Sequence, residues 1–242
     1  MTATSMMKGA SALLSPARAE TYLRASSQWG HPPGSSQHYA RAFDLYTWNS
    51  KLAAALWGPI SLVEVVVRNA MHARFTDHFH RDDWWEHPSL QLCPDDRHSL
   101  EEAWDHASER CGGGIPPPGQ VIATSSLGTW TRLLGPGTPR HPVLDYETKL
   151  WQPFLCDAFP HRASRGRKYI HSHLRDIQRL RNRIAHNEPL FKSPVQQLHE
   201  KLLEVAGMVH PDAEDCLLAH SRATSVLAEF TEVRSGTWTA TF

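Results

Sequence analysis

The segment from Gln37 to Phe79 constrains the fold of this chain most, because apolar residues recur along it at helical spacing. One side of the first part carries Tyr39, Phe43, Tyr46, Ala53 and Trp57, flanked by Leu45, Trp48, Leu52 and Leu56. An apolar face this wide indicates a helix buried from two directions. Gly58-Pro59 predicts that this helix ends or kinks there. A second helix is expected from the spacing of Ile60, Val63, Val67, Met71, Phe75 and Phe79.

The rest of the chain also has helical rather than strand periodicity, and two Gly/Pro-rich segments interrupt it near 112–119 and 135–142. Further helices are expected from Ser15-Pro16 and over 95–110, 121–134, 169–186, 198–209 and 213–230. The piece between the two breaks is too short for a domain of its own, so both breaks are interpreted as surface loops. The prediction is an all-α bundle of about eight helices. It forms a single domain over 15–234, between tails at 1–14 and 235–242.

Composition limits the functional classes. The chain has 242 residues with 25 basic and 25 acidic side chains, so a nucleic-acid site requires local clustering of positive charge. The chain shows no signal peptide, and its longest apolar stretch, 52–67, is interrupted by Gly58, Pro59, Ser61 and Glu64. No membrane association is therefore expected, and the predicted location is the cytoplasm.

Neither the cysteines nor the 16 histidines form a metal-ligand pattern. The four cysteines are widely spread, without a CxxC pair, and are expected to be semi-buried free thiols in a reducing compartment. The pairs His78/His80 and His171/His173 are two positions apart, where side chains diverge on a helix. No metal and no cofactor are predicted.

The most informative segment is 180–190, Leu-Arg-Asn-Arg-Ile-Ala-His-Asn-Glu-Pro-Leu. Asn182 and His186 are four apart and share a helix face, whereas Arg181 lies about 140° around the axis from His186. Pro189 disfavours helical geometry just before it, so the helix is expected to end near His186. The sequence thus places a partly exposed histidine beside the guanidinium groups of Arg181 and Arg183.

These residue types suit phosphodiester chemistry. Guanidinium groups match phosphate oxygens, and a histidine exchanges protons near neutral pH. The segment lacks a Ser or Cys nucleophile and lacks carboxylates arranged for a metal, but RNA supplies its own nucleophile, the 2′-hydroxyl. Metal-free RNA transesterification is therefore the predicted reaction. Because one histidine cannot serve as both acid and base, the mechanism predicts a homodimer. The structural alternative is that Arg181 and His186 only cap a helix end.

The segment Arg181-Asn182-(three residues)-His186 resembles the R-x₄₋₆-H signature of HEPN domains. The longer string 180–189 resembles the Abi-like (AbiD/AbiF-type) abortive-infection proteins of bacteria, as do 45–49, 64–70, Leu150-Trp151 and Phe159-Pro160. The resemblance covers roughly 38–230. It departs from the family pattern at 127–130, which is less aromatic than expected, and at Asn187, where a second histidine is expected.

This resemblance implies a HEPN-like helical fold, a dimer with a composite cleft, and a ribonuclease toxin of phage defence. RNA would be the substrate, and a neutralising antitoxin or a phage trigger would be a further partner. Carried over residue by residue, Arg181, Asn182 and His186 are the catalytic candidates. The alternative function is a non-catalytic HEPN-like module that binds RNA or protein.

Several other residues are candidate RNA contacts, each with a structural alternative. Arg183 is either a phosphate contact or an ordinary surface arginine. Glu64 and Arg68 are spaced for a partly buried salt bridge, or else Arg68 and Asn69 face the same cleft as Arg181. The basic stretch 161–168 is either a solvated loop or an RNA-backbone contact through Arg165, Arg167 and Lys168. The tryptophans are expected mainly in the core rather than as base-stacking platforms.

Overall fold

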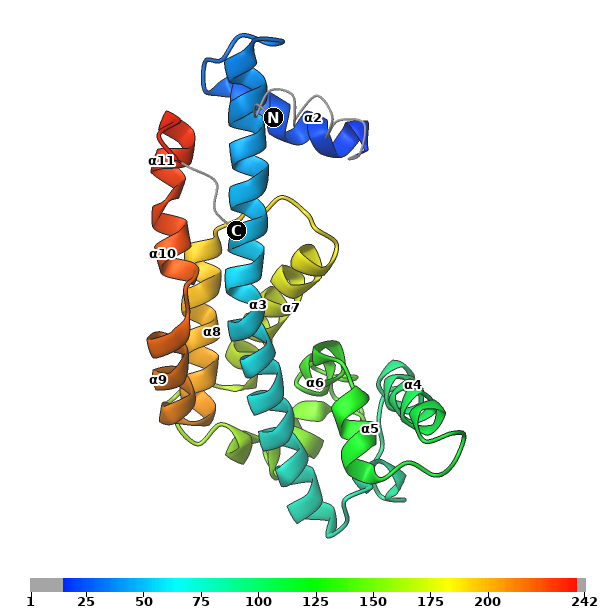
Figure 1. The fold of residues 1–242 in the computed structure, drawn as a ribbon. Coiled ribbons are helices and arrows are strands. Elements are labelled where there is room, and N and C mark those ends of the chain that lie inside the picture. The colour runs from blue at the N-terminus through cyan, green and yellow to red at the C-terminus, as the bar shows by residue number, and fades with distance from the viewer. Residues whose placement is uncertain (1–14, 239–242) are drawn as a thin grey trace. The chain divides into compact units, whose positions relative to one another are not determined.

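The computed structural model describes residues 15–238, and over this range the chain is all-α (Figure 1). It contains ten α-helices, α2 to α11, and one isolated β-bridge between Gly137 and Asp145. The predicted all-α class is confirmed for these residues. The breaks at 112–117 and 135–142 are non-helical, as expected. The predicted tail at 1–14 lies outside the described residues.

The described chain divides into two compact units, where the sequence predicts one domain. Unit 1 comprises 15–58, 182–199 and 221–238, and unit 2 comprises 59–181 and 200–220. The boundaries after 58, 181 and 199 fall inside helices, and the boundary after 220 falls between two helices. The first coincides with Gly58-Pro59, the expected kink, whereas no boundary falls in the Gly/Pro-rich segments near 112–119 and 135–142. The boundaries after 181 and 199 have no signal in the composition, because the helix continues while its two halves contribute to different cores.

Helix α3 (Ser36–Phe79) is a single 44-residue helix with Pro59 inside it. The expectation of two separate helices is therefore wrong. Proline lacks an N–H group, which leaves the carbonyl of Ala55 without its helical donor and costs ~3 kcal/mol. Leu56 and Ile60 on either side are 0% and 1% exposed, and burying each contributes about 1.5–3 kcal/mol. Burial along the helix thus offsets the local defect.

Helix α3 is also the one helix among residues 15–238 whose length and composition would suffice to cross a membrane. An 18-residue stretch of it has a mean hydropathy of 1.5, and 39% of that stretch is buried. The central helix of a soluble protein meets the same criterion. Leu52 and Val63, which contribute to this hydropathy, are fully buried.

Unit 1 is built around the first part of α3. Its complete helices are α2 (Pro16–Gln28), α10 (Ala223–Ala228) and α11 (Phe230–Ser235). Helices α10 and α11 lie along α3 (Figure 1). There the indole N–H of Trp48 donates to the Val226 carbonyl at 2.8 Å, and Lys51 pairs with Glu229 at 2.8 Å. Trp238 also bonds to Glu229, at 2.8 Å. The described part of the predicted 235–242 tail is therefore packed.

The C-terminal helices are more broken than the sequence predicts. Helix α8 (Val195–Val209) matches its prediction, but the expected helix over 213–230 is replaced by α9 (Pro211–His220), α10 and α11. The break after α9 has a local cause. The hydroxyl of Ser221 accepts the Ala223 N–H at 3.3 Å and bonds to His199 at 2.8 Å. Side-chain bonding of this kind competes with helix continuation.

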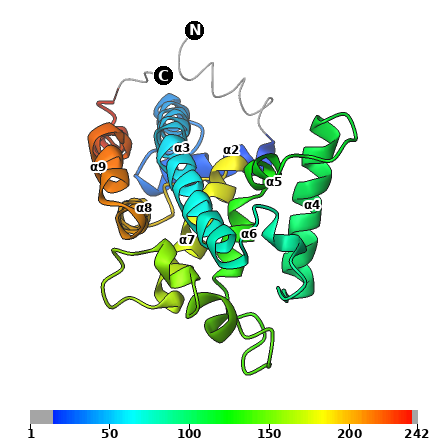
Figure 2. The same ribbon diagram turned by 90° about the horizontal axis from the view of Figure 1, so that it is seen from below.

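Unit 2 contains α9, the second part of α3 and most of α8. Its other complete elements are η1 (Trp84–Glu86), α4 (Pro94–Arg110), α5 (Pro118–Thr124), α6 (Leu127–Leu133), η2 (Glu147–Trp151) and η3 (Leu155–Ala158). Helices α4, α5 and α6 gather on one side of this unit (Figure 2). The single helix expected over 121–134 is wrong, because the chain turns between α5 and α6. There Ser126 caps α6 by accepting the Thr129 N–H, and Ser125 accepts the indole N–H of Trp130 at 2.8 Å.

The core of unit 2 is aromatic. The rings of Phe75 and Trp84 stack at 3.9 Å between centroids, and Trp84 meets Trp130 at 6.1 Å. The expectation that most tryptophans are core residues is confirmed for these two and for Trp48. In contrast, Trp57 and Trp104 are 44% and 36% exposed.

Candidate functional site

The helix that carries the sequence motif, α7 (Arg167–Ala185), ends as the sequence predicts. Asn187 adopts a left-handed backbone with φ of 52°. Its N–H donates to the Ile184 carbonyl at 3.0 Å, and the Glu188 N–H donates to the Arg183 carbonyl at 2.8 Å. This pair of bonds is a Schellman motif, which satisfies carbonyls that a helix end otherwise leaves unpaired.

His186 occupies the turn directly after α7 and is exposed. Its backbone is fixed at both polar groups: the N–H donates to the Asn182 carbonyl at 2.9 Å, and the carbonyl accepts from Arg18 at 3.1 Å. Asn182 is exposed as well. The imidazole is therefore presented to solvent from a well-anchored backbone, as a proton-transfer group requires.

Arg181 is partly buried on α7. The division of the fold falls between Arg181 and Asn182, so Arg181 belongs to unit 2 whereas Asn182 and His186 belong to unit 1. Along α7 the helical period sets their relation, with Asn182 and His186 on one face and Arg181 displaced around the axis.

Arg183 takes part in the helix end. Its guanidinium pairs with Glu188 at 3.0 Å and bonds to the Ser193 hydroxyl. Because Arg183 and Glu188 are also linked through their backbones, this pair reinforces the turn. The placement favours a structural role for Arg183 over a phosphate contact.

The connector after the motif is tied to α3 by a buried amide. The side-chain oxygen of Asn49 accepts the Leu190 N–H at 2.6 Å, and Asn49 is only 4% exposed. This residue lies in the 45–49 segment, whose sequence resembles the Abi-like proteins but carries no local signal of this contact. Its contact fixes the path of the chain just beyond His186.

A cavity of about 250 Å³ lies in unit 1 next to the motif. Its lining comprises Tyr22, Tyr46, Asn49, Ser50, Ala53, Ala54, Trp57, Ile184, Asn187 and Glu188. The wall therefore combines aromatic rings with amide and carboxylate groups, and two of its residues follow His186 directly. The sequence does not reveal this cavity. Helical spacing places Tyr46 and Trp57 on one face of a helix, but it does not show which segments pack against that face.

Arg68 and Asn69 lie in unit 2. Arg68 donates to the Ala123 carbonyl at 3.2 Å, and its Nε is buried without a partner. Glu64, the expected partner of Arg68, instead accepts the Leu127 N–H at 3.1 Å. Both side chains thus hold the α5–α6 segment, as a structural role requires, while Asn69 is exposed.

The three residues of the basic stretch have different surroundings. Arg165 pairs with Glu204 at 2.7 Å and lies over the Tyr169 ring. Arg167 is only 4% exposed. Its guanidinium pairs with Glu147 at 2.8 Å and donates to a backbone carbonyl, so its placement favours a structural role. Lys168 is exposed, and its expected RNA contact stays a prediction.

Within the described range, no group of three or more His, Cys, Asp or Glu side chains is arranged to hold a metal ion. His78 stacks on Phe154 with centroids 4.3 Å apart, and burial lowers the pKa of His171.

The cysteines are free. Cys93, Cys111 and Cys156 are half-buried, as expected, whereas Cys216 is exposed.

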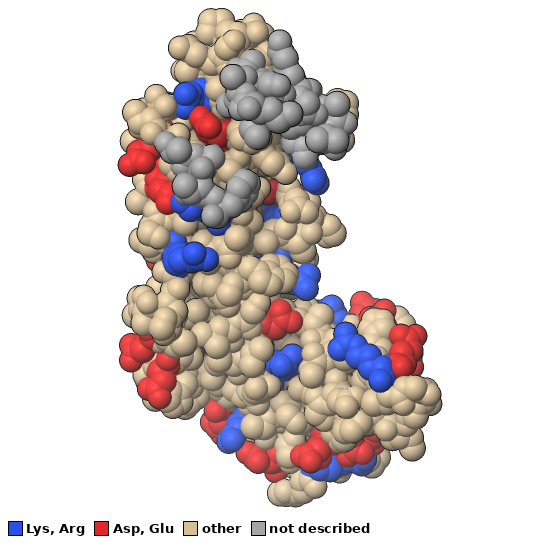
Figure 3. Space-filling model, viewed as in Figure 1, with Lys and Arg blue, Asp and Glu red and all other residues tan. Residues whose placement is uncertain are grey.

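Charge on the visible face is mixed. Basic and acidic side chains are interspersed there, and no large basic patch stands out (Figure 3).

Comparisons with protein-family models, with curated proteins and with solved structures found no match to this chain. The candidate site therefore depends on its own residues and on the sequence resemblance.

Proposed function

We propose that this chain is a metal-independent endoribonuclease of the HEPN-like, Abi-like type, with Arg181, Asn182 and His186 as its catalytic residues. The observation that carries the proposal is the exposed imidazole of His186 in the anchored turn after α7, with Asn182 exposed one helical turn before it. A histidine that only capped the helix would need no particular exposure. The cap itself is supplied by backbone bonds of Asn187 and Glu188.

The proposed reaction is transesterification. A base removes the proton of the 2′-hydroxyl, the 2′-oxygen attacks the neighbouring phosphorus, and the bond from phosphorus to the 5′-oxygen breaks. An acid gives a proton to the departing 5′-oxygen. The products are a 2′,3′-cyclic phosphate and a 5′-hydroxyl. Arg181 stabilises the charge on the phosphoryl oxygens, His186 acts as acid or base, and Asn182 orients either group.

A homodimer completes the proposed mechanism. One chain offers one histidine in the motif, whereas the reaction needs both a base and an acid. A two-fold axis would place two copies of His186 at one cleft. We further propose a bacterial phage-defence role in the cytoplasm, with RNA as substrate, no cofactor, and an antitoxin or a phage component as regulator.

The cavity beside the motif supports substrate binding. Its volume of about 250 Å³ and its Trp57 wall suit a nucleobase next to the scissile phosphate. Stacking a base on an aromatic side chain contributes about 1–3 kcal/mol with little sequence preference. Asn187 supplies an amide for the polar edge of that base.

The deciding experiment is cleavage of total RNA in EDTA by wild type, His186→Ala and a control variant, His98→Ala. His98 is an exposed histidine on α4, outside the motif. We expect activity in wild type and in the control, and a loss of at least 100-fold in His186→Ala, in line with the usual contribution of general acid–base catalysis, about 10²–10⁴. Circular dichroism establishes that all three are folded.

Activity that survives His186→Ala would refute this site, and activity abolished by EDTA would refute the metal-free mechanism. RNA binding without cleavage by wild type would favour the non-catalytic module. End-group analysis of the products then tests the chemistry, because any end other than a cyclic phosphate with a 5′-hydroxyl contradicts 2′-hydroxyl attack.

A further inference from the structure

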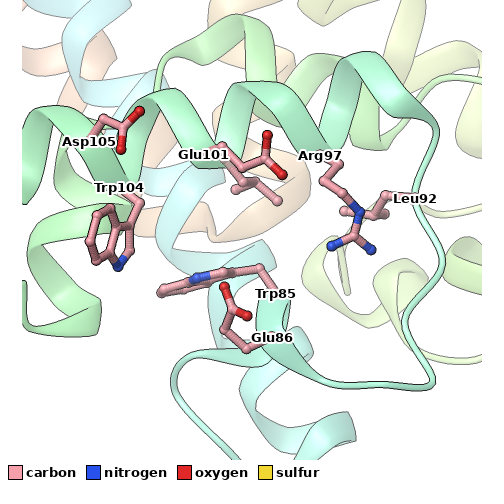
Figure 4. A pocket seen from close by; sticks show the side chains of 8 residues that line it. Trp85, Glu86, Leu92, Arg97, Glu101, Trp104 and Asp105 are labelled. Carbon is pink, nitrogen blue, oxygen red and sulfur yellow. The ribbon is translucent and has the colours of Figure 1, made fainter. Parts of the chain in front are cut away.

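A second cavity, in unit 2, combines two tryptophans with several carboxylates. Its volume is about 220 Å³, and it lies between η1 and α4. The lining residues are Trp85, Glu86, Leu92, Arg97, Leu100, Glu101, Trp104 and Asp105. Figure 4 shows Trp85 and Trp104 reaching this cavity from the two elements, with Glu86 beside Trp85 and Glu101 on α4.

The floor of this cavity is apolar and fixed. Trp85, Leu92 and Leu100 are 7%, 7% and 3% exposed, and the Trp85 ring packs edge-on against Trp84 at 5.4 Å. Such packing holds the indole in place before any ligand arrives, which reduces the entropic cost of binding. Trp104 at the rim is 36% exposed, which is unusual for a side chain of this size.

The rim is acidic. Three carboxylates, those of Glu86, Glu101 and Asp105, line the cavity with one guanidinium. The guanidinium of Arg97 donates to the Leu90 carbonyl at 3.4 Å, and its single positive charge leaves the lining with a net negative charge. The field at the mouth therefore favours a cation and repels a phosphate.

We infer that this cavity binds an organic ammonium group with an apolar body, held between Trp85 and Trp104 and neutralised by Glu86, Glu101 and Asp105. Aromatic faces attract a cation through the ring quadrupole, and tryptophan does so most strongly. The carboxylates add charge complementarity, and the apolar floor accommodates methyl or methylene groups. The base of a nucleotide would also stack on an indole ring, but the phosphate of that nucleotide would meet the acidic rim. The inference does not depend on RNA cleavage.

The test is to titrate the full chain with choline and, separately, with its neutral carbon isostere 3,3-dimethylbutan-1-ol. Ligand-observed NMR measures the binding of each. We expect choline to bind at least tenfold more tightly than the isostere. Trp104→Ala and the double variant Glu101→Gln/Asp105→Asn should each weaken choline binding about tenfold. Glu102→Gln, an exposed carboxylate on the same helix but outside the cavity, should bind as wild type.

Equal binding of choline and its isostere would overturn the inference, as would binding unchanged in Trp104→Ala or absent from wild type. Preference for adenosine monophosphate over choline would overturn it too, in favour of a nucleobase. A peptide carrying trimethyl-lysine identifies the source of the cation. Binding more than tenfold tighter than choline supports an ammonium group on a protein partner, and equal or weaker binding supports a free small molecule.

Discussion

Single side chains in this protein have roles that depend on what they touch. Asn49 and Asn182 illustrate the contrast, since both are asparagines on long helices. Asn49 is buried and satisfies the Leu190 N–H, whereas Asn182 is exposed next to the turn that presents His186. The first is therefore expected to serve stability and the second to serve chemistry.

Replacement of Asn49 by alanine should lower the free energy of unfolding by about 1–3 kcal/mol, because it leaves the Leu190 N–H without an acceptor. Urea denaturation measures this change. The matched control is Asn182→Ala, which we expect to stay within about 0.5 kcal/mol of wild type, as exposed substitutions usually do. Equal stability of Asn49→Ala and wild type would mean that the amide does not anchor the connector.

His72 makes stability depend on pH. Burial lowers the pKa of His72 below its ordinary value of 6.5, and the positive charge of Arg68 lowers it further, against the opposing effect of Asp82. Its Nδ1 accepts the indole N–H of Trp84 at 2.9 Å, which requires a neutral ring. The pKa of His72 is 6.5 in the unfolded chain and lower in the folded protein. Between these two pKa values the unfolded chain binds more protons than the folded protein, so stability falls as the pH falls through 6.5 toward the pKa of the folded protein.

Chemical denaturation at pH 8, 7, 6 and 5 should therefore show a smaller loss of stability in His72→Asn than in wild type. The amide oxygen of asparagine takes the place of Nδ1 as the acceptor for Trp84 and does not titrate. Between pH 8 and 7, residue 72 should contribute little to the pH dependence of stability in either protein. Identical slopes between pH 7 and 5 would show that His72 is not the cause.

At the scale of elements, α3 continues through Gly58 and Pro59, two residues that disfavour helix. Apart from its two chain neighbours and the nearby backbone of α3, a β-carbon added at Gly58 would meet no atom within 4 Å, and the position is exposed. The glycine enlarges the entropy of the unfolded chain, whereas the ring of Pro59 opposes a β-carbon on the residue before it in helical geometry.

Gly58→Ala should raise the free energy of unfolding by less than about 1 kcal/mol, because the contact with the Pro59 ring offsets part of the entropic gain. The contrasting variant is Gly135→Ala, where the new β-carbon would lie 2.7 Å from the backbone oxygen of Arg132 and should destabilise the fold. Thermal denaturation of both compares them directly. A destabilised Gly58→Ala would indicate that the helix needs its glycine for a bend or a motion.

For the whole molecule, the proposed mechanism requires two copies of the motif. The formal net charge is zero, so long-range repulsion between like-charged chains does not oppose self-association. We predict a homodimer at micromolar concentration, measured by sedimentation velocity. Excess His186→Ala protein, after subunit exchange, should suppress wild-type cleavage, because each mixed dimer has one histidine. A strict monomer, or activity indifferent to the excess, would contradict the composite site.

The sequence alone determined the all-α class, the helices α2, α4, α7 and α8, and the end of α7 before Pro189. These features arise from local causes: apolar spacing at the helical period, missing N–H groups and capping residues. The same local signals located His186 at an exposed helix end.

Only the tertiary structure decided the rest. Packing carries α3 through Pro59, and serine side chains break the predicted helices at 125–126 and 221–222. Glu147 and Glu188 engage Arg167 and Arg183. The cavity beside Asn187 forms between segments distant in sequence, and the cavity beside Trp104 forms where η1 packs against α4. Such contacts depend on which faces meet, and the period of a single helix does not encode that information.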